Sequence, residues 1–382
     1  MEQDIINKKI HLVILGQDAS ILDESSEAAQ RTRSYAKSFS GISVYVFARK
    51  IPQNKARYDN VFVTGFSTLL KSFFSFVQIY KDIRSLKRKK IQVLISTQDP
   101  FEIGLAGFFL SRITQAAFHV QVHTDISSQY MRKESVRARI QVCIASFVLK
   151  KADRIRAVSK RIKEFCVNRY KIESERIDYV PMMYADSQHK DVNNSTDLTG
   201  GKKIFLVPTR FVPLKRVPYI IDAFAAATKH DDSVRLRIVG SGPNKKEILD
   251  AIEKNNISNQ VELIPWVNDM GILYKDAYAV LVASLYEGWC RVASESVMHH
   301  IPVIMTDVGC ANEWLEDKKQ GLVIPIENKS AFISAITDII NKEDLHRSLV
   351  LGCITKSQTI PSFSSYTKQI ITSWLEAISQ TK

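Results

Sequence analysis

Two glutamates eight positions apart, Glu287 and Glu295, lie on either side of the point where a predicted helix begins. The helix starts at Arg291 and follows a predicted strand at residues 279–283. The free N–H groups and positive dipole of a helix N-terminus can bind a phosphate. A carboxylate at the entry accepts hydrogen bonds from hydroxyls, and one two turns later can hold the vicinal diol of a ribose. Two solvated glutamates on an ordinary helix are the alternative for this pattern taken alone.

A basic pair follows another predicted strand in the same half of the chain. Arg210 and Lys215 stand five positions apart in the loop after the strand at residues 204–207. A guanidinium and an ammonium group at the carboxyl end of a strand can neutralise a diphosphate. A solvated basic loop is the alternative for the pair by itself.

One histidine of the first half is a further candidate. His123 lies in the segment QVHTD, residues 121–125, at the end of a predicted strand. An imidazole at that place could polarise or orient a substrate, although a lone histidine is more often a structural group.

Several common sites are absent from the sequence. It has no G-x-x-x-x-G-K-[ST] motif, which excludes a P-loop, and the loop GSGP at 240–243 lacks the third glycine of a dinucleotide-binding fingerprint. The absence of D-x-D argues against a diphosphate held through a carboxylate-bound metal. The five cysteines are scattered without a C-x-x-C pair, which predicts reduced thiols in a cytosolic compartment and no structural zinc site.

The positive charge of the chain is concentrated in its first half. Residues 1–200 contain 32 Lys and Arg against 20 Asp and Glu, a net of +12, whereas residues 201–382 contain 21 against 20, a net of +1. Such an excess favours an anionic partner: nucleic acid, acidic lipid headgroups or phosphorylated substrates. A basic surface that only keeps the protein soluble is the alternative. No aromatic-interleaved RNA motif or helix-turn-helix signature supports nucleic acid.

The 382 residues, 45% of them hydrophobic, suffice for two domains. Alternating strands and helices predict two α/β domains with doubly wound parallel sheets, spanning residues 1–190 and 200–360, joined by a polar linker at 189–203. The predicted strands are 10–15, 42–47, 91–96, 118–122, 155–158, 204–207, 234–239, 261–264, 279–283, 302–306 and 322–324. The predicted helices are 25–39, 68–85, 136–151, 160–167, 217–227, 245–254, 291–300, 331–341 and 366–379. Ligands of such sheets bind at the carboxyl ends of the strands.

No apolar stretch is long enough to span a membrane, and the polar opening at residues 1–9 does not resemble a signal peptide. A soluble chain is therefore expected.

Taken together, the motifs resemble glycosyltransferase family 4. The resemblance rests on the segments SLYEGWCRVASE at 284–295, PVIMTDVG at 302–309 and GLVIP at 321–325. In the first half it extends to STQDPFE at 96–102, HTD at 123–125, ADRIRAVS at 152–159 and VPMMYAD at 180–186. The E-x7-E motif of the family corresponds to Glu287 and Glu295, and its basic pair corresponds to Arg210 and Lys215.

This resemblance implies a GT-B fold: two Rossmann-like domains facing across a cleft, the first for the acceptor and the second for the donor, with the C-terminal helix, within residues 366–382, packing back on the first domain. It implies a retaining transfer of a hexose from a UDP- or GDP-linked sugar to a hydroxyl of a glycan or lipid-linked saccharide, in polysaccharide or glycoconjugate synthesis. No cofactor and no obligatory metal are expected.

The resemblance also implies roles for individual residues. Arg210 and Lys215 would hold the diphosphate and stabilise the leaving group. Glu287 would contact the transferred sugar, Glu295 the ribose, and His123 would lie near sugar and acceptor. The other expected donor-binding residues are Gly288, Trp289, Cys290, Arg291, Val292, Trp266 and Val267, and the expected acceptor side consists of Gly16, Gln98, Asp99, His123 and Asp125.

The sequence departs from the family pattern at two places. Cys290 stands where the family often has glycine, and GQDAS at 16–20 replaces a Gly-Gly loop after the first strand. A non-catalytic nucleotide-sugar-binding protein, which would not need Glu287, and a hydrolase or phosphorylase of the same fold remain alternatives, although no pyridoxal lysine for a phosphorylase is identified.

The basic first half suggests a cytoplasmic protein at the inner face of a membrane. The basic run at 84–90 and the helix at 68–85 are candidates for contact with anionic lipid, with a core position of that helix as the competing interpretation.

Overall fold

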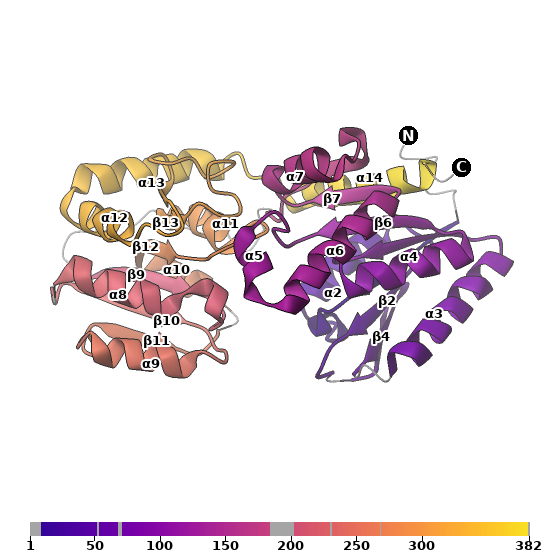
Figure 1. The fold of residues 1–382 in the computed structure, drawn as a ribbon, viewed down its shortest axis with the longest axis horizontal. Coiled ribbons are helices and arrows are strands. Elements are labelled where there is room, and N and C mark those ends of the chain that lie inside the picture. Colours follow the sequence, from indigo (N-terminus) through magenta and orange to yellow (C-terminus); the bar gives the residue numbers. More distant parts are fainter. Residues whose placement is uncertain are drawn as a thin grey trace. The chain divides into compact units, whose positions relative to one another are not determined.

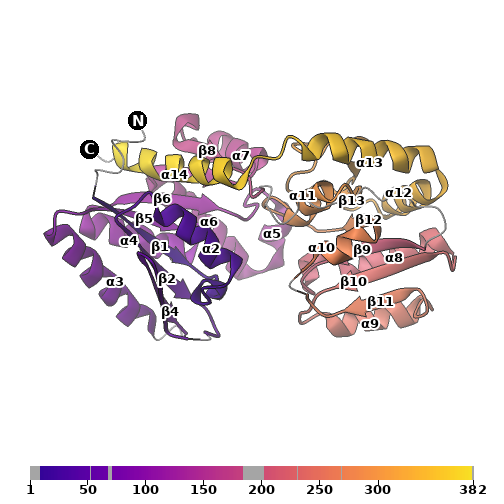
Figure 2. The ribbon, with the colours of Figure 1, turned by 180° about the vertical axis from the view of Figure 1, so that it is seen from behind.

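The computed structural model describes residues 9–51, 53–67, 71–183, 202–229, 231–267 and 269–380, with side chains from 74 onward in the segment that begins at 71. The chain divides into two compact units: unit 1 comprises Met1–Pro181 and Ser364–Lys382, and unit 2 comprises Met182–Phe363. In Figures 1 and 2 each unit is a sheet covered by helices. Most of the predicted linker at 189–203 lies outside the described residues.

Unit 1 contains an eight-stranded sheet in the order β3-β4-β2-β1-β5-β6-β7-β8. All neighbouring strands are parallel except β3 and β4, which form an antiparallel pair at one edge. The strands are β1 (Ile10–Gly16), β2 (Gly41–Phe47), β3 (Lys55–Tyr58), β4 (Val61–Phe66), β5 (Gln92–Thr97), β6 (Ala117–Val122), β7 (Arg154–Ala157) and β8 (Ile177–Tyr179). The helices are α2 (Glu27–Ala36), α3 (Lys71–Arg88), α4 (Glu102–Thr114), α5 (Gln129–Glu134), α6 (Val136–Lys151), α7 (Lys160–Tyr170) and α14 (Phe363–Ser379).

The central strands of unit 1 form because their residues are apolar on both faces. Every residue of β1 and β6 is buried, which is the pattern of a parallel strand covered by helices on both sides. The edge pair β3–β4 and the helices α4 and α5 were not predicted. In α4 most residues are apolar, so the sequence shows no clear alternation of polar and apolar faces that would predict a helix. Gly107 of this helix packs closely on β5, since a Cβ there would lie 2.4 Å from Thr97 Cγ2.

The last helix of the chain, α14, belongs to unit 1. Trp374 is 1% exposed, and its Nε1 donates a hydrogen bond of 3.0 Å to Ser96 Oγ at the end of β5. Ser373 Oγ donates to Asp178 Oδ2 at 2.6 Å, and Arg156 on β7 donates to the hydroxyl of Tyr366 at 3.0 Å. The C-terminal residues therefore complete the core of the unit that the N-terminal residues begin.

Unit 2 contains a six-stranded, fully parallel sheet in the order β11-β10-β9-β12-β13-β14. The strands are β9 (Lys203–Pro208), β10 (Val234–Val239), β11 (Val261–Ile264), β12 (Ala277–Val282), β13 (Val303–Thr306) and β14 (Gly321–Ile324). The helices are α8 (Val217–Thr228), α9 (Lys245–Lys254), α10 (Gly271–Lys275), α11 (Arg291–Met298), α12 (Lys329–Asn341) and α13 (Glu343–Ser357). The strand order reverses between β9 and β12, and such a point is where open α/β sheets bind ligands.

The predicted fold class, two α/β units built on parallel sheets, is confirmed. Among the described residues, no helix is long and apolar enough to cross a membrane.

Replacing Trp374 by Ala is expected to destabilise unit 1 by about 3–5 kcal/mol, because it removes a fully buried aromatic side chain and a buried hydrogen bond. The measurement is urea unfolding followed by circular dichroism. Trp266→Ala is the matched control, because that side chain is 55% exposed and its loss should leave the free energy of unfolding nearly unchanged. Equal effects of the two substitutions would contradict the packing of α14.

Candidate functional site

Two loops of unit 2 meet at the point where the strand order reverses. One follows β9 and carries Arg210 and Lys215, and the other follows β12 and carries Glu287. The backbone N–H of Leu285 donates to the carbonyl of Leu214 at 2.9 Å and joins the loops directly. Their residues line a small hollow, whose lining includes Thr209, Lys215, Ser284, Glu287, Cys290 and Val292.

Lys215 and Glu287 form an ion pair between these loops, through Lys215 Nζ and Glu287 Oε1. Their side chains are only 16% and 15% exposed. Ser284 Oγ donates to the same carboxylate oxygen at 2.8 Å, and Thr306 Oγ1 donates to the carbonyl of Ser284 at 2.7 Å. The carboxylate of Glu287 is thus held in one orientation by groups from three neighbouring segments.

The helix α11 begins where the sequence predicts it, directly after Cys290. Cys290 has a left-handed backbone (φ 73°, ψ 74°), a conformation that suits glycine, so the glycine frequent in the family has a geometric reason. The Cys290 side chain is buried, and burial raises the pKa of its thiol to about 12. This thiol is therefore uncharged at physiological pH, and it lines the hollow.

The turn between Glu287 and α11 is fixed by close packing. Trp289 is 2% exposed and packs on Trp314, and its carbonyl accepts a hydrogen bond of 2.8 Å from Cys310 N–H. Gly309 has φ +57°, and a Cβ there would lie 2.4 Å from the Trp289 carbonyl oxygen. Gly288 is buried in the same turn. The Trp289 side chain is thus part of the core of unit 2, and its expected role in donor binding stays a prediction.

Glu295 lies on α11, four residues after Arg291, the first residue of the helix, and is partly exposed. Arg291 Nη2 lies 2.9 Å from Glu295 Oε1, and Tyr274 Oη donates to Oε2 at 3.4 Å. The two E-x7-E glutamates have therefore different partners: Lys215 holds Glu287, and Arg291 holds Glu295.

Arg210 is exposed, and within the described part of the chain its guanidinium forms no ion pair or hydrogen bond. The backbone around it is nevertheless held in place. Phe211 N–H donates to Ser241 O at 2.8 Å, and Cβ atoms at Gly240 and Gly242 would lie 1.9 Å from Thr209 O and 2.4 Å from Phe211 O. The GSGP loop, which the sequence analysis only rejected as a dinucleotide fingerprint, is a backbone support for the Arg210 loop.

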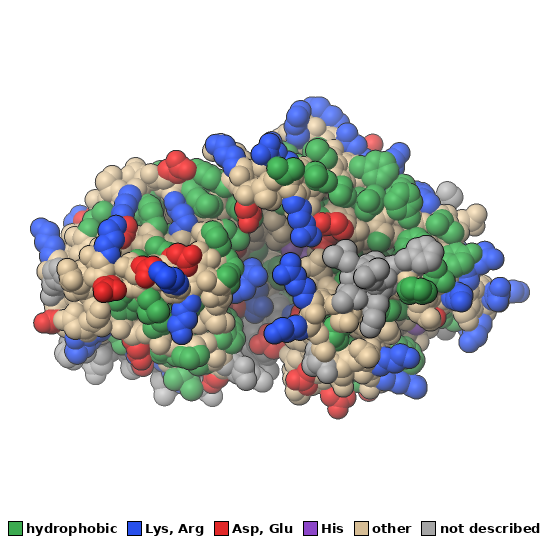
Figure 3. All heavy atoms as spheres, turned by 60° about the horizontal axis from the view of Figure 1, so that its bottom comes forward, with side chains coloured by type: hydrophobic (Ala, Val, Ile, Leu, Met, Phe, Trp, Pro, Cys, Tyr) green, Lys and Arg blue, Asp and Glu red, His purple; other side chains and the backbone are tan. Residues whose placement is uncertain are grey.

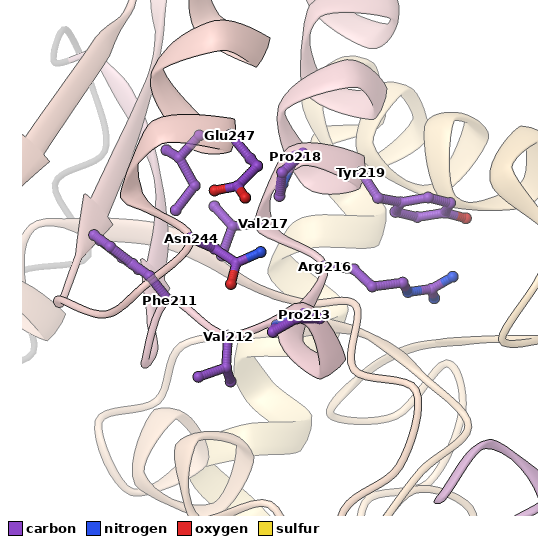
Figure 4. Close-up of a pocket in the computed structure, with 10 residues that line it drawn as sticks. Phe211, Val212, Pro213, Arg216, Val217, Pro218, Tyr219, Asn244 and Glu247 are labelled. Carbon is purple, nitrogen blue, oxygen red and sulfur yellow. The ribbon is translucent and has the colours of Figure 1, made fainter. Parts of the chain in front are cut away.

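Arg216 also supports this loop, although no sequence motif pointed to it. Its backbone is left-handed (φ 50°), and its guanidinium donates to Ala283 O and to Ile326 O, each at 2.7 Å. It lies over the Tyr219 ring at 4.3 Å, and Figure 4 shows both side chains pointing away from Asn244. Arg216 is the residue after Lys215 in the chain. Its hydrogen bonds to Ala283 and Ile326 therefore also hold the backbone of Lys215 in place.

Trp266 and Val267 follow β11, an edge strand that is two strands away from β9. The Trp266 ring is 55% exposed, and no contact of the described side chains joins it to Lys215 or Glu287. The structure does not bring these two residues together with the ion pair.

In unit 1 the predicted acceptor residues lie at the carboxyl ends of three adjacent strands, β1, β5 and β6. Gln98 lies over Gly16, where a Cβ would be 2.0 Å from Gln98 Oε1. Asp99 Oδ1 accepts from Phe101 N–H at 2.8 Å at the start of α4, and burial raises the pKa of this carboxyl to about 6.

His123 and Asp125 follow β6. Burial, together with the nearby guanidinium of Arg156, lowers the pKa of His123 to about 3, so the imidazole is neutral at physiological pH. Its Nε2 lies 3.2 Å from Gln121 Oε1, which itself accepts from Arg156 at 2.7 Å. Asp125 is 5% exposed and accepts from the N–H and hydroxyl of Ser127, so its carboxylate shapes the turn.

No group of three or more His, Cys, Asp or Glu among the described residues is placed to hold a metal ion. The expected independence from metal stays a prediction.

Residues 189–350 match the family model described as "Glycosyl transferases group 1". The chain is 21% identical over 294 residues to an Escherichia coli UDP-Gal:alpha-D-GlcNAc-diphosphoundecaprenol alpha-1,3-galactosyltransferase, covering 73% of each chain. It is 25% identical over 209 residues to a Staphylococcus aureus poly(ribitol-phosphate) alpha-N-acetylglucosaminyltransferase, covering 53% of this chain but less than half, 42%, of that relative.

Among solved structures, the fold is similar to Anabaena HepE in complex with UDP and glucose, with a TM-score of 0.72, 15% identity and coverage of 98% and 100% of the two chains. The GT-B fold and the resemblance to glycosyltransferases are therefore confirmed, whereas membership of family 4 in particular stays a prediction.

Replacing Gly240 by Ala is expected to destabilise unit 2 by about 1–3 kcal/mol, because φ is +150° and the new Cβ would overlap Thr209 O. Gly271→Ala is the matched control, since its nearest neighbour is the flexible Asp269 side chain at 3.1 Å. Thermal unfolding measures both. If Gly240→Ala were as stable as the control, the GSGP loop would not support the Arg210 loop.

Proposed function

We propose that this chain, a GT-B glycosyltransferase by its fold and by the family match of residues 189–350, transfers a hexose from a UDP- or GDP-linked sugar to a hydroxyl of a glycan or lipid-linked saccharide. The observation that carries the proposal is the ion pair of Lys215 and Glu287 in the hollow where α11 begins.

In this proposal the diphosphate of the donor binds Arg210, Lys215 and the first N–H groups of α11. An ammonium group has three N–H donors, so Lys215 can keep its bond to Glu287 and also bind a phosphate oxygen. When the bond between the sugar and the diphosphate breaks, negative charge grows on the diphosphate. Preorganised positive groups stabilise that charge, which is usually the largest catalytic contribution.

In this proposal the two glutamates bind the two sugars of the donor, the transferred hexose and the ribose. Glu287, oriented by Ser284 and Lys215, accepts hydrogen bonds from hydroxyls of the transferred hexose. Glu295 accepts the ribose hydroxyls while Arg291 holds its carboxylate. The names of the relatives support such a donor: one contains UDP-Gal, and HepE was solved with UDP and glucose.

Unit 1 provides the acceptor side. His123 is a neutral imidazole there, and burial raises the pKa of the Asp99 carboxyl to about 6. Gln98 and the backbone at Gly16 complete this group. The names of two relatives contain phosphate-bearing acceptors, which supports a lipid-linked or polymeric saccharide. Retention of the anomeric configuration and independence from metal are parts of the proposal.

Lys215→Ala and Glu287→Ala are each expected to lower turnover by about 10²–10³-fold or more, because each removes a charge that acts on the donor. The measurement is sugar transfer or donor hydrolysis with a panel of UDP and GDP sugars. Lys329→Ala is the matched control, since it breaks a more exposed ion pair with Asp222 in the same unit. Unchanged rates in both site variants would refute the assignment.

The rival functions give different results in the same assay. A nucleotide-sugar-binding protein would bind UDP or GDP by calorimetry but turn over no donor, and Glu287→Ala would leave binding intact. A hydrolase would release the sugar at the same rate with or without acceptors. Binding of UDP or GDP in the presence of EDTA is expected, and binding only after addition of a divalent cation would contradict metal independence.

A cytoplasmic position at an anionic membrane surface is the second part of the proposal. Three helices of unit 1 expose large apolar side chains: Phe74 on α3 is 74% exposed, and the others are Phe109 and Ile113 on α4 and Val136, Ile140 and Phe147 on α6. Figure 3 shows hydrophobic side chains between Lys and Arg side chains over unit 1, on the right. Apolar groups interspersed with basic ones suit a surface of anionic lipid.

Phe109→Glu/Ile113→Glu is expected to reduce co-sedimentation with vesicles that contain anionic lipid, because it removes apolar contacts and adds negative charge. Wild-type binding should weaken as salt rises. Ile272→Glu/Leu351→Glu is the matched control in unit 2, where these side chains are 63% and 58% exposed. A wild-type chain that shows no salt-sensitive binding would defeat the membrane proposal.

A further inference from the structure

A second hollow, of about 340 Å³, lies in unit 1 against α5, α6 and α7. These three helices are neighbours in Figures 1 and 2. Its lining combines arginines with apolar and uncharged polar groups, and contains no aspartate or glutamate: Arg132, Arg139, Val142, Cys143, Ser146, Phe165, Arg169 and Tyr170.

The three arginines of this pocket are not neutralised by the protein. Neither Arg132, Arg139 nor Arg169 forms an ion pair with a carboxylate of the described residues. Arg137 on the same helix α6 behaves differently, because it pairs with Glu102 at 3.0 Å. Three like charges around one hollow repel one another unless an anion occupies it.

Two buried polar atoms of the lining also lack a partner. Tyr170 is 7% exposed, and its hydroxyl oxygen has no hydrogen bond within the described structure; nor has the buried Nε of Arg132. Both groups pack on Phe165: the Arg132 guanidinium lies 5.5 Å from the ring, and the Tyr170 ring meets it edge-on at 5.1 Å. A buried donor without a partner destabilises the fold, so a ligand that accepts its hydrogen bond removes this cost.

The Tyr170 hydroxyl is available as a donor at physiological pH. Burial is the main cause that raises the pKa of Tyr170 to about 12, and the nearby arginines Arg132 and Arg169 oppose it only in part. The pocket thus offers guanidinium and hydroxyl donors and no competing acceptor with a negative charge.

We propose that this pocket binds a phosphoryl group, as a phosphate or diphosphate, between Arg132, Arg139, Arg169 and the hydroxyl of Tyr170. Planar guanidinium forks match phosphate oxygens, and Val142 and Phe165 provide an apolar wall for the part of the ligand that bears the phosphate. The site consists of unit 1 residues only and is additional to the proposed donor site. A phospholipid headgroup and a soluble phosphorylated compound share this chemistry.

Alkylation of Cys143 can report whether the pocket is occupied, because this side chain lies in the lining and is exposed. The other cysteines are buried: Cys166, Cys290, Cys310 and Cys353. Iodoacetamide is expected to alkylate Cys143 first in the native chain. At a pyrophosphate concentration about ten times its Kd, alkylation should slow by about tenfold, because only the empty pocket reacts. Chloride at equal ionic strength should not protect. Equal rates with and without pyrophosphate, together with no effect of phospholipid vesicles, would overturn the proposal.

Arg139→Ala/Arg169→Ala should lose this protection while the unprotected rate stays the same, because both side chains are exposed and their removal spares the core. Arg137→Ala is the matched control on α6 and should keep it. Arg210→Ala should also keep it, which separates this pocket from the donor site. Protection that persists in the double variant would overturn the proposal.

Vesicles of phosphatidylcholine with phosphatidic acid distinguish the two sources of phosphate. Protection by soluble pyrophosphate assigns the pocket to a soluble phosphoryl compound, and protection by these vesicles alone assigns it to a lipid headgroup, provided that the double variant loses it. Vesicle protection that the double variant retains means that a membrane merely covers Cys143, and this result contradicts the phosphoryl pocket.

Discussion

The candidate site depends on one ion pair that joins two loops, that of Lys215 and Glu287. Both side chains are more than four-fifths buried, so each charge has lost most of its water. Removing one partner of such a pair leaves an uncompensated charge, at a cost of about 3–5 kcal/mol. The pair therefore fixes the distance between the loop after β9 and the loop after β12. It also keeps an ammonium group near the N-terminal end of α11, the place proposed above for the diphosphate of the donor.

The loops around this pair approach one another so closely that several positions have no room for a Cβ atom. Gly240 and Gly242 let the loop after β10 contact the backbone of the loop after β9. Gly309 lets the loop after β13 contact the backbone of Trp289. Arg216 ties the end of the first loop to Ala283 and Ile326. Such contacts make the positions of Lys215 and Glu287 a property of the unit 2 sheet, because each loop is held by its neighbours.

In unit 1 the buried histidines are neutral, and the arginines fall into two groups. Its buried histidines are neutral, since burial lowers the pKa of His11 to about 4 and those of His119 and His123 to about 3. Its arginines are of two kinds: Arg154 and Arg156 are bound by Asp178, Gln121 and Tyr366, whereas those of the pocket against α5, α6 and α7 have no anionic partner. The excess of +12 in residues 1–200 thus includes charge that is available for anions.

Local sequence determined much of this protein. Short apolar patterns interrupted by charged residues predicted β10 and β11 at their observed bounds, and α6, α9 and the start of α11 agree with the prediction, because the spacing of apolar residues is a local property. The types and spacing of Arg210, Lys215, Glu287 and Glu295 made them candidates, and the ordered family motifs around them selected them. Only the tertiary structure decided which of them touch: Lys215 pairs with Glu287 across 72 residues, Trp289 turns into the core, and Trp266 stays apart. It also decided the roles of Gly240 and Arg216 and the grouping of Arg132, Arg139 and Arg169, because packing brings together residues that no sequence period relates.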